Sequence, residues 1–178
     1  IADMHGMVRG TLERQPAELF LRETALTRPT PDIRKLARST SAAQGGAPLA
    51  TLHSLNGQLN AMLEFDVTAT SAETTAGEAF AARHGVCQDF AHILVAAART
   101  LAIPARYVSG YFLRTDTISQ TAGHAWAEAH VAGLGWVGFD PAHGTSTTDR
   151  YIRVAIGCDA REAARTLGGR ARRVQLDG

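Results

Sequence analysis

The sequence has few of the features that mark a disulfide-rich, membrane-spanning or nucleic-acid-binding protein. Only two cysteines occur in 178 residues, Cys87 and Cys158, and neither belongs to a Cys-x-x-Cys pair. Two are too few for a disulfide framework, so a reducing, cytoplasmic setting is expected. The net charge of +1 gives no electrostatic basis for binding nucleic acid or an anionic membrane. No apolar run is long enough to span a bilayer, and no signal peptide is evident.

What is present fits an ordinary globular chain, with 45% hydrophobic and 20% charged residues. The first half shows helix signals. Thr30 is a hydroxyl N-cap before Pro31, and Thr75 with Glu78 fits a capping box whose helix Gly85 is expected to end. The strongest apolar stripe stops before Pro104. These patterns predict helices over about residues 30–39, 49–65, 75–85 and 87–102.

After Pro104 the hydrophobic period changes to two, which predicts strands. The predicted strands cover residues 106–112, 124–131, 136–140 and 151–156. Within 124–131, alternation places His124 and Trp126 on one face and a run of alanines on the other, as close packing on a helix would select. Helices followed by an antiparallel sheet indicate the α+β class.

Cys87 lies at the predicted start of the long helix, directly after Gly85-Val86. The positive end of a helix dipole stabilises a thiolate, and free backbone N–H groups at that end can bind an oxyanion. A lone cysteine is otherwise most often buried packing. Its position at a helix start makes Cys87 the candidate nucleophile and leaves Cys158 as packing.

His124 begins one predicted strand and Asp140 ends the next. The two come side by side if the hairpin folds near Ala132, whereas a tighter turn at Gly133-Leu134 would offset them. If they meet, Asp140 orients the imidazole, and His124 deprotonates Cys87 and later protonates the leaving amine. Each could alone be structural, His124 as a partly buried histidine and Asp140 as a turn residue. If Asp140 pointed to solvent, Glu128 would be the alternative orienting carboxylate.

Four motifs in this order resemble the bacterial transglutaminase-like superfamily, of the type predicted to be cysteine proteases. They are Gly85-Val86-Cys87-Gln88-Asp89-Phe90-Ala91-His92, the segment from Leu101 to Tyr111, Gly123-His124-Ala125-Trp126-Ala127-Glu128, and Gly135-Trp136-Val137-Gly138-Phe139-Asp140-Pro141. The resemblance runs from about Pro31 to Ile156. It implies a papain-like or transglutaminase-like α+β core, in which the nucleophile helix packs on an antiparallel sheet, and Cys87, His124 and Asp140 as the catalytic triad.

The resemblance also sets the expected organisation. Residues 30–160 form the catalytic core, 1–29 are a remnant or linker of an upstream region, and 161–178 are a C-terminal tail that holds an arginine cluster. The familiar animal enzymes depend on calcium and use a tryptophan upstream of the nucleophile, but this sequence has neither an acidic calcium loop nor such a tryptophan. The second oxyanion donor is therefore unassigned.

The expected reaction is acyl transfer through a thioester, with hydrolysis of a peptide or amide bond favoured over protein-glutamine transamidation. A non-catalytic binding domain of the same fold and a thiol redox sensor are the alternatives. The expected partner is a peptide or protein substrate, in a groove to which Tyr107, Tyr111 and Trp126 could contribute.

No cofactor is expected. No metal site is expected either, because His84, His130 and His143 have no recognised ligand spacing with Cys87. The oligomeric state is left open.

Overall fold

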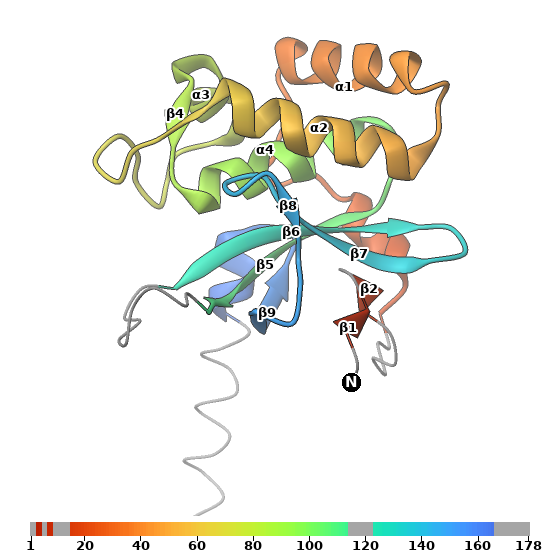
Figure 1. The fold of residues 1–178 in the computed structure, drawn as a ribbon. Helices are drawn as coiled ribbons and strands as arrows, with labels where there is room; N and C mark the ends of the chain where they lie inside the picture. The colour runs from red at the N-terminus through yellow and green to blue at the C-terminus, as the bar shows by residue number, and fades with distance from the viewer. Residues whose placement is uncertain (1–2, 5–6, 9–14, 114–122, 166–178) are drawn as a thin grey trace, which may run out of the picture.

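The computed structural model describes residues 3–4, 7–8, 15–113 and 123–165, and its main helices gather on one side of a sheet (Figure 1). This is the predicted α+β arrangement. The helices are α1 (Pro31–Ala43), α2 (Pro48–Met62), α3 (Ala76–Ala82), α4 (Cys87–Thr100) and a 3-10 helix, η1 (Ala17–Leu21). The strands are β1 (Asp3–Met4), β2 (Met7–Val8), β3 (Glu64–Phe65), β4 (His84–Gly85), β5 (Ala105–Phe112), β6 (His124–Val131), β7 (Gly135–Asp140), β8 (Thr145–Ser146) and β9 (Tyr151–Gly157).

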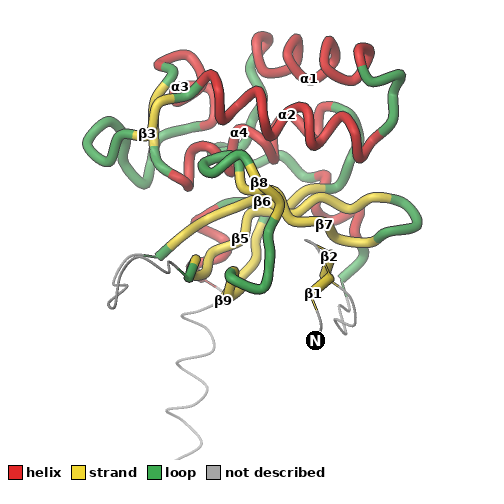
Figure 2. Tube along the Cα trace, viewed as in Figure 1, coloured by secondary structure: helices red, strands yellow, loops and turns green. Residues whose placement is uncertain are grey.

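The main sheet has the order β1-β2-β7-β6-β5-β9, with β8 paired to β7 off this path. Every neighbouring pair in it is antiparallel. A separate two-stranded pair, β3 with β4, is parallel and lies beside the start of α4 (Figure 2). The predicted strands over 106–112, 124–131, 136–140 and 151–156 therefore correspond to β5, β6, β7 and β9.

The core lies between α4 and the sheet. Ile93, Leu94 and Val95 of α4 are at most 1% exposed, and Ala127 and Ala129 of β6 are buried in the same cluster. Small alanine side chains let the helix approach the strand closely, as the alternation in 124–131 predicted. Burying each of the three large aliphatic side chains contributes about 1.5–3 kcal/mol. This packing fixes the position of the first residue of α4 relative to β6.

The helix starts follow the sequence signals, but three helix ends differ from the prediction. The helix α1 continues to Ala43 rather than to about residue 39, and α2 ends at Met62, because Glu64–Phe65 form β3 instead of extending the helix to residue 65. The Thr30 hydroxyl accepts the Ile33 N–H at the start of α1, and both hydrogen bonds of the predicted capping box are present at Thr75. The expectation that Gly85 ends the third helix is wrong. Arg83 ends it by adopting a left-handed conformation with φ of 64°, and Gly85 pairs with Phe65 in β4 instead.

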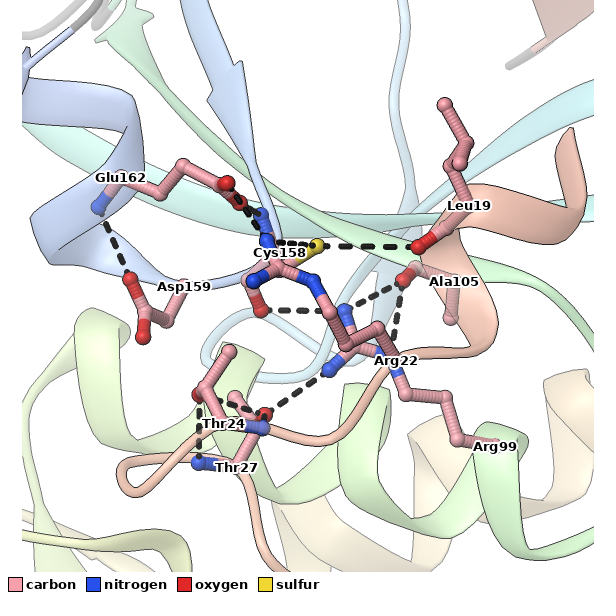
Figure 3. A network of polar contacts seen from close by, with 9 residues as sticks. All are labelled: Leu19, Arg22, Thr24, Thr27, Arg99, Ala105, Cys158, Asp159 and Glu162. Atoms are coloured by element: carbon pink, nitrogen blue, oxygen red, sulfur yellow. Dashed lines mark hydrogen bonds and ion pairs between the residues drawn. The ribbon is translucent and has the colours of Figure 1, made fainter. Parts of the chain in front are cut away.

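A buried guanidinium ties the segment before α1 to the sheet. Arg99 of α4 donates to the backbone oxygens of Ala105 at 2.8 Å and Cys158 at 2.9 Å, and to the Thr27 hydroxyl at 2.8 Å (Figure 3). It also donates to the backbone oxygen of Phe20 at 2.8 Å. Burial lowers the pKa of Arg99 to about 10, which leaves it charged at neutral pH. The Arg99 side chain thus connects three segments that are far apart in sequence: the one that holds Phe20 and Thr27, the start of β5 and the end of β9.

Described residues on both sides of the expected core, before residue 30 and after residue 160, contact it. β2 pairs with β7, and the Phe20 ring meets Trp136 edge-on at 5.3 Å. On the other side, Ala163 is buried in a cluster that includes Ala91 of α4. The boundaries at residues 30 and 160 stay predictions, and residues 114–122 and 166–178, with most of the arginine cluster, lie outside the described residues.

In the described part of the chain, no helix has the length and apolar character to cross a membrane.

Candidate active site

Cys87 is the first residue of α4 and is half-buried. It packs against a small apolar cluster that contains Tyr107 of β5 and Ala125 of β6. The backbone N–H groups of a first helical turn have no intrahelical acceptor, so they are available beside the thiol. The structure therefore places Cys87 where a thiolate or an oxyanion would meet the positive end of the helix dipole.

Asp89 caps this helix start. Its Oδ2 accepts the Val86 N–H at 2.9 Å and the Thr70 hydroxyl at 2.6 Å. Burial raises the pKa of Asp89, although these hydrogen bonds oppose the rise. The loop that carries Thr70 is thereby attached to the turn that presents Cys87.

The register of the β6–β7 hairpin decides whether His124 and Asp140 meet. Ala127 pairs with Phe139 and Val131 pairs with Gly135, so the turn is the tighter one centred on Gly133. Continued along the strands, this register places Asp140 opposite Trp126, two residues from His124. Because side chains alternate with a period of two, that offset keeps His124 and Asp140 on the same face.

The three predicted side chains come together in one chain of contacts. His124 Nε2 lies 2.7 Å from Asp140 Oδ2. The other ring nitrogen, Nδ1, is left for the Cys87 thiol, which lies close enough to His124 to raise its pKa. Burial disfavours charge on the imidazole, but the hydrogen bonds to Asp140 and Cys87 prevail and raise the pKa of His124 to about 9. This arrangement favours an imidazolium beside the sulfur.

Asp140 is fully buried, and it is held by more donors than the sequence predicted. Its Oδ2 also lies 2.7 Å from His143 Nδ1 and accepts the Tyr151 hydroxyl at 2.8 Å. Its Oδ1 accepts the N–H groups of Ala142 and His143. Although burial opposes ionisation, the hydrogen bonds from His124 and His143 hold the pKa of Asp140 well below its usual range.

Sequence reasoning did not place His143 or Tyr151 at this carboxylate. Phe112 of β5 packs against both, with ring centroids 4.8 Å from His143 and 4.7 Å from Tyr151. A signal for His143 existed locally, because an aspartate often accepts backbone N–H groups two and three residues on. No local signal identified Tyr151, which reaches Asp140 only because β9 pairs with β5.

The three residues suggested for a substrate groove differ in accessibility. Trp126 and Tyr107 are 1% and 5% exposed, whereas Tyr111 is 47% exposed. The Trp126 ring contacts Tyr151 edge-on at 5.3 Å and supports the face that carries His124. Substrate binding by these residues stays a prediction, and among them Tyr111 has the exposed ring.

Glu128, the alternative orienting carboxylate, faces other partners. It is buried and accepts from Arg106 Nε at 2.8 Å and from Arg153 at 3.2 Å.

Cys158 is also buried, and its carbonyl accepts a hydrogen bond from Arg99 (Figure 3). Burial, followed by a hydrogen bond to Glu162, raises the pKa of Cys158. Cys158 is therefore the less reactive of the two thiols on physical grounds.

Comparison with known proteins agrees with this architecture. A sequence model described as Transglutaminase-like superfamily matches residues 34–141, a range that contains Cys87, His124 and Asp140. An uncharacterized protein of Mycobacterium leprae is 39% identical over 89 residues, which cover 47% of this chain and 31% of that protein. An uncharacterized protein of Mycobacterium tuberculosis is 39% identical over 101 residues, covering 51% and 32%. The matched segments thus span about a third of these curated relatives.

Two solved structures extend the likeness to three dimensions. A "putative cysteine protease" from Cytophaga hutchinsonii has a TM-score of 0.68 and 26% identity, covering 89% of this chain and 53% of that one. The periplasmic domain of TgpA from Pseudomonas aeruginosa has a TM-score of 0.56 and 25% identity, covering 72% and 47%. Each likeness covers about half of the solved chain rather than its full length.

Proposed function

This chain belongs to the transglutaminase-like superfamily, and we propose that it hydrolyses peptide or amide bonds through a thioester formed on Cys87. One observation carries the proposal: a half-buried thiol at a helix start contacts an imidazole whose other nitrogen lies 2.7 Å from a buried carboxylate. Nucleophile, base and orienting group are then in the order that acyl transfer needs.

The proposed reaction proceeds in two halves. The Cys87 sulfur attacks the carbonyl carbon as His124 Nδ1 holds the thiol proton, and the carbonyl oxygen takes the negative charge. The backbone N–H groups of Cys87 and Gln88, in the first turn of α4, are the proposed donors to that oxyanion. Collapse of the intermediate breaks the C–N bond, and His124 gives its proton to the leaving amine. Water, deprotonated by His124, then releases the acid and restores the thiol.

Asp140 is proposed to orient the imidazole rather than to transfer protons. Its five hydrogen-bond donors fix the carboxylate, so that His124 Nε2 is held toward Asp140 and Nδ1 toward the sulfur. The neighbour from Cytophaga hutchinsonii, described as a "putative cysteine protease", supports hydrolysis over transamidation. Transamidation uses the same three residues with an amine in place of water.

An assay with both outcomes tests the proposal. The chain is incubated with a peptide mixture and a fluorescent primary amine, and products are identified by mass spectrometry. We expect cleaved peptides or deamidated side chains that disappear in Cys87→Ala and persist in the matched control Cys158→Ala. Amine-labelled glutamine as the main product would establish transamidation instead. No product, together with equal thiol reactivity of Cys87 and Cys158, would indicate a binding domain.

Because the chain spans about a third of its curated relatives, the substrate and partners of the whole protein are also proposals. A peptide or protein substrate is expected from the reaction class. The cytoplasmic location and the lack of nucleic-acid and membrane partners stay predictions.

A further inference from the structure

The carboxylate of Asp140 lies between two imidazoles that come from different parts of the chain. His124 Nε2 and His143 Nδ1 are each 2.7 Å from Asp140 Oδ2, and one ligand atom from each of the three residues lies within 4.8 Å of the others. Two histidine nitrogens and one carboxylate oxygen are a ligand set that zinc uses when a fourth position is left open. Of the residues that the sequence analysis considered and rejected as zinc ligands, only His143 belongs to this set.

The spacing of the ligand atoms suits such an ion with little movement. Atoms bound to tetrahedral zinc at about 2.0–2.2 Å stand roughly 3.3 Å from each other. Each nitrogen is 2.7 Å from the oxygen and retreats by about 0.6 Å by the same geometry, while the two nitrogens, which lie within 4.8 Å of each other, move to that separation as well. Small side-chain rotations supply that change.

The surroundings hold these ligands in place independently of any ion. Asp140 Oδ1 accepts the N–H groups of Ala142 and His143, and the Tyr151 hydroxyl donates to Oδ2. Phe112 packs against both imidazoles, at 5.8 Å from His124 and 4.8 Å from His143. Hydrogen-bonded carboxylates and fixed rings are the outer support that metal ligands need.

Access differs between the two sides of the cluster. The His143 side chain is 45% exposed, whereas those of His124 and Asp140 are 11% and 0% exposed. An ion can therefore arrive from the His143 side without opening the core. Water can fill the remaining coordination position on that side.

We propose that His124 Nε2, Asp140 Oδ2 and His143 Nδ1 form a Zn²⁺ site that switches off Cys87. The ion replaces the N–H protons that face Asp140, and these protons leave to solvent. A ring bound through Nε2 carries its single remaining proton on Nδ1, so it cannot accept the thiol proton. The proposed zinc binding is argued from the geometry alone. The proposed loss of turnover rests in addition on the proposed function.

Calorimetric titration of the chain with Zn²⁺ tests the site without any substrate. We expect one equivalent to bind to the unmodified chain and to Cys87→Ala with equal affinity, because the thiol is not a ligand. His143→Ala should weaken binding at least about tenfold, since even supporting residues of metal sites contribute that much. The matched control is His130→Ala, which removes a histidine that packs on Trp136 rather than on Asp140.

A second measurement follows the alkylation rate of Cys87 with and without Zn²⁺. We expect zinc to slow alkylation in the unmodified chain and EDTA to restore it, whereas in His143→Ala the rates measured with and without zinc should be the same. Zinc binding that is lost in Cys87→Ala but kept in His143→Ala would place the ion on the sulfur and overturn the proposal, as would no binding at all. Failure of peptide hydrolysis would refute the proposed function and leave the calorimetric result standing.

Discussion

The side chain of Asp89 occupies the space that a side chain on Gly85 would need. A Cβ added to Gly85 would lie 2.7 Å from Asp89 Oδ2 and 2.9 Å from Asp89 Cβ. Asp89 is 1% exposed and cannot swing into solvent. The absence of a side chain at position 85 therefore lets the carboxylate accept the Val86 N–H and hold the turn that presents Cys87.

Gly85→Ala tests this relationship. We expect the free energy of unfolding to fall by about 1–3 kcal/mol, because the new methyl overpacks a buried site and displaces a helix cap. Urea denaturation measures the change. The matched control is Gly57→Ala in α2, where an added Cβ meets nothing within 4 Å. That variant should gain about 0.5–1 kcal/mol from helix propensity, and an equal response of the two variants would contradict this account.

The two thiols should differ in reactivity. We expect iodoacetamide to alkylate Cys87 at least about tenfold faster than Cys158 at neutral pH, because Cys87 is half-buried beside His124 and Cys158 is 3% exposed. Mass spectrometry of the two peptides over time gives both rates. His124→Ala should slow only Cys87. A Cys87 rate that ignores this substitution would remove His124 from the site.

His92 should make stability depend on pH. It is fully buried on α4, where its Nε2 accepts the Ala160 N–H at 3.1 Å, and burial lowers the pKa of His92 to about 4. The nearby charges of Asp159 and Arg99 act in opposite directions. The folded state binds the proton more weakly than the unfolded state, so this stabilisation is complete above about pH 6.5 and is lost as the pH falls toward 4.

Denaturation at pH 7 and at pH 4.5 measures that loss. We expect His92 to account for about 2–3 kcal/mol of the difference, given 1.36 kcal/mol for each pKa unit. In His92→Gln an amide oxygen can still accept the Ala160 N–H, so the variant should show a smaller fall between the two pH values. An unchanged fall would assign the pH dependence to other groups.

Replacing Arg99 should lower the stability of the fold strongly. Arg99→Met leaves the backbone oxygens of Phe20, Ala105 and Cys158 without this donor in a buried site. We expect a loss of about 2–4 kcal/mol in the free energy of unfolding. Arg22→Met is the control, because the Arg22 side chain is 62% exposed where it pairs with Glu162, and its loss should change the free energy of unfolding much less. Thermal or urea unfolding distinguishes the two, and similar losses would contradict the role given to Arg99.

Local sequence determined the parts of the site that depend on short-range physics. The capping box at Thr75, the helix stop before Pro104 and the alternation around His124 arise from hydrogen bonds and side-chain periodicity within a few residues. They were enough to place Cys87 at a helix start and His124 and Asp140 on strands. Arg83 shows the limit of such reasoning, since glycine was the expected helix end and an arginine took the left-handed conformation instead.

The tertiary structure decided how these pieces meet. The sequence left the hairpin turn open, and the observed register keeps His124 and Asp140 on one face at an offset of two residues. Pairing of β9 with β5 then brings Tyr151 to the same carboxylate that His143 reaches from the following turn. Strand register and cross-sheet pairing are set by packing among distant segments, so no single stretch of sequence contains the information that places these donors around Asp140.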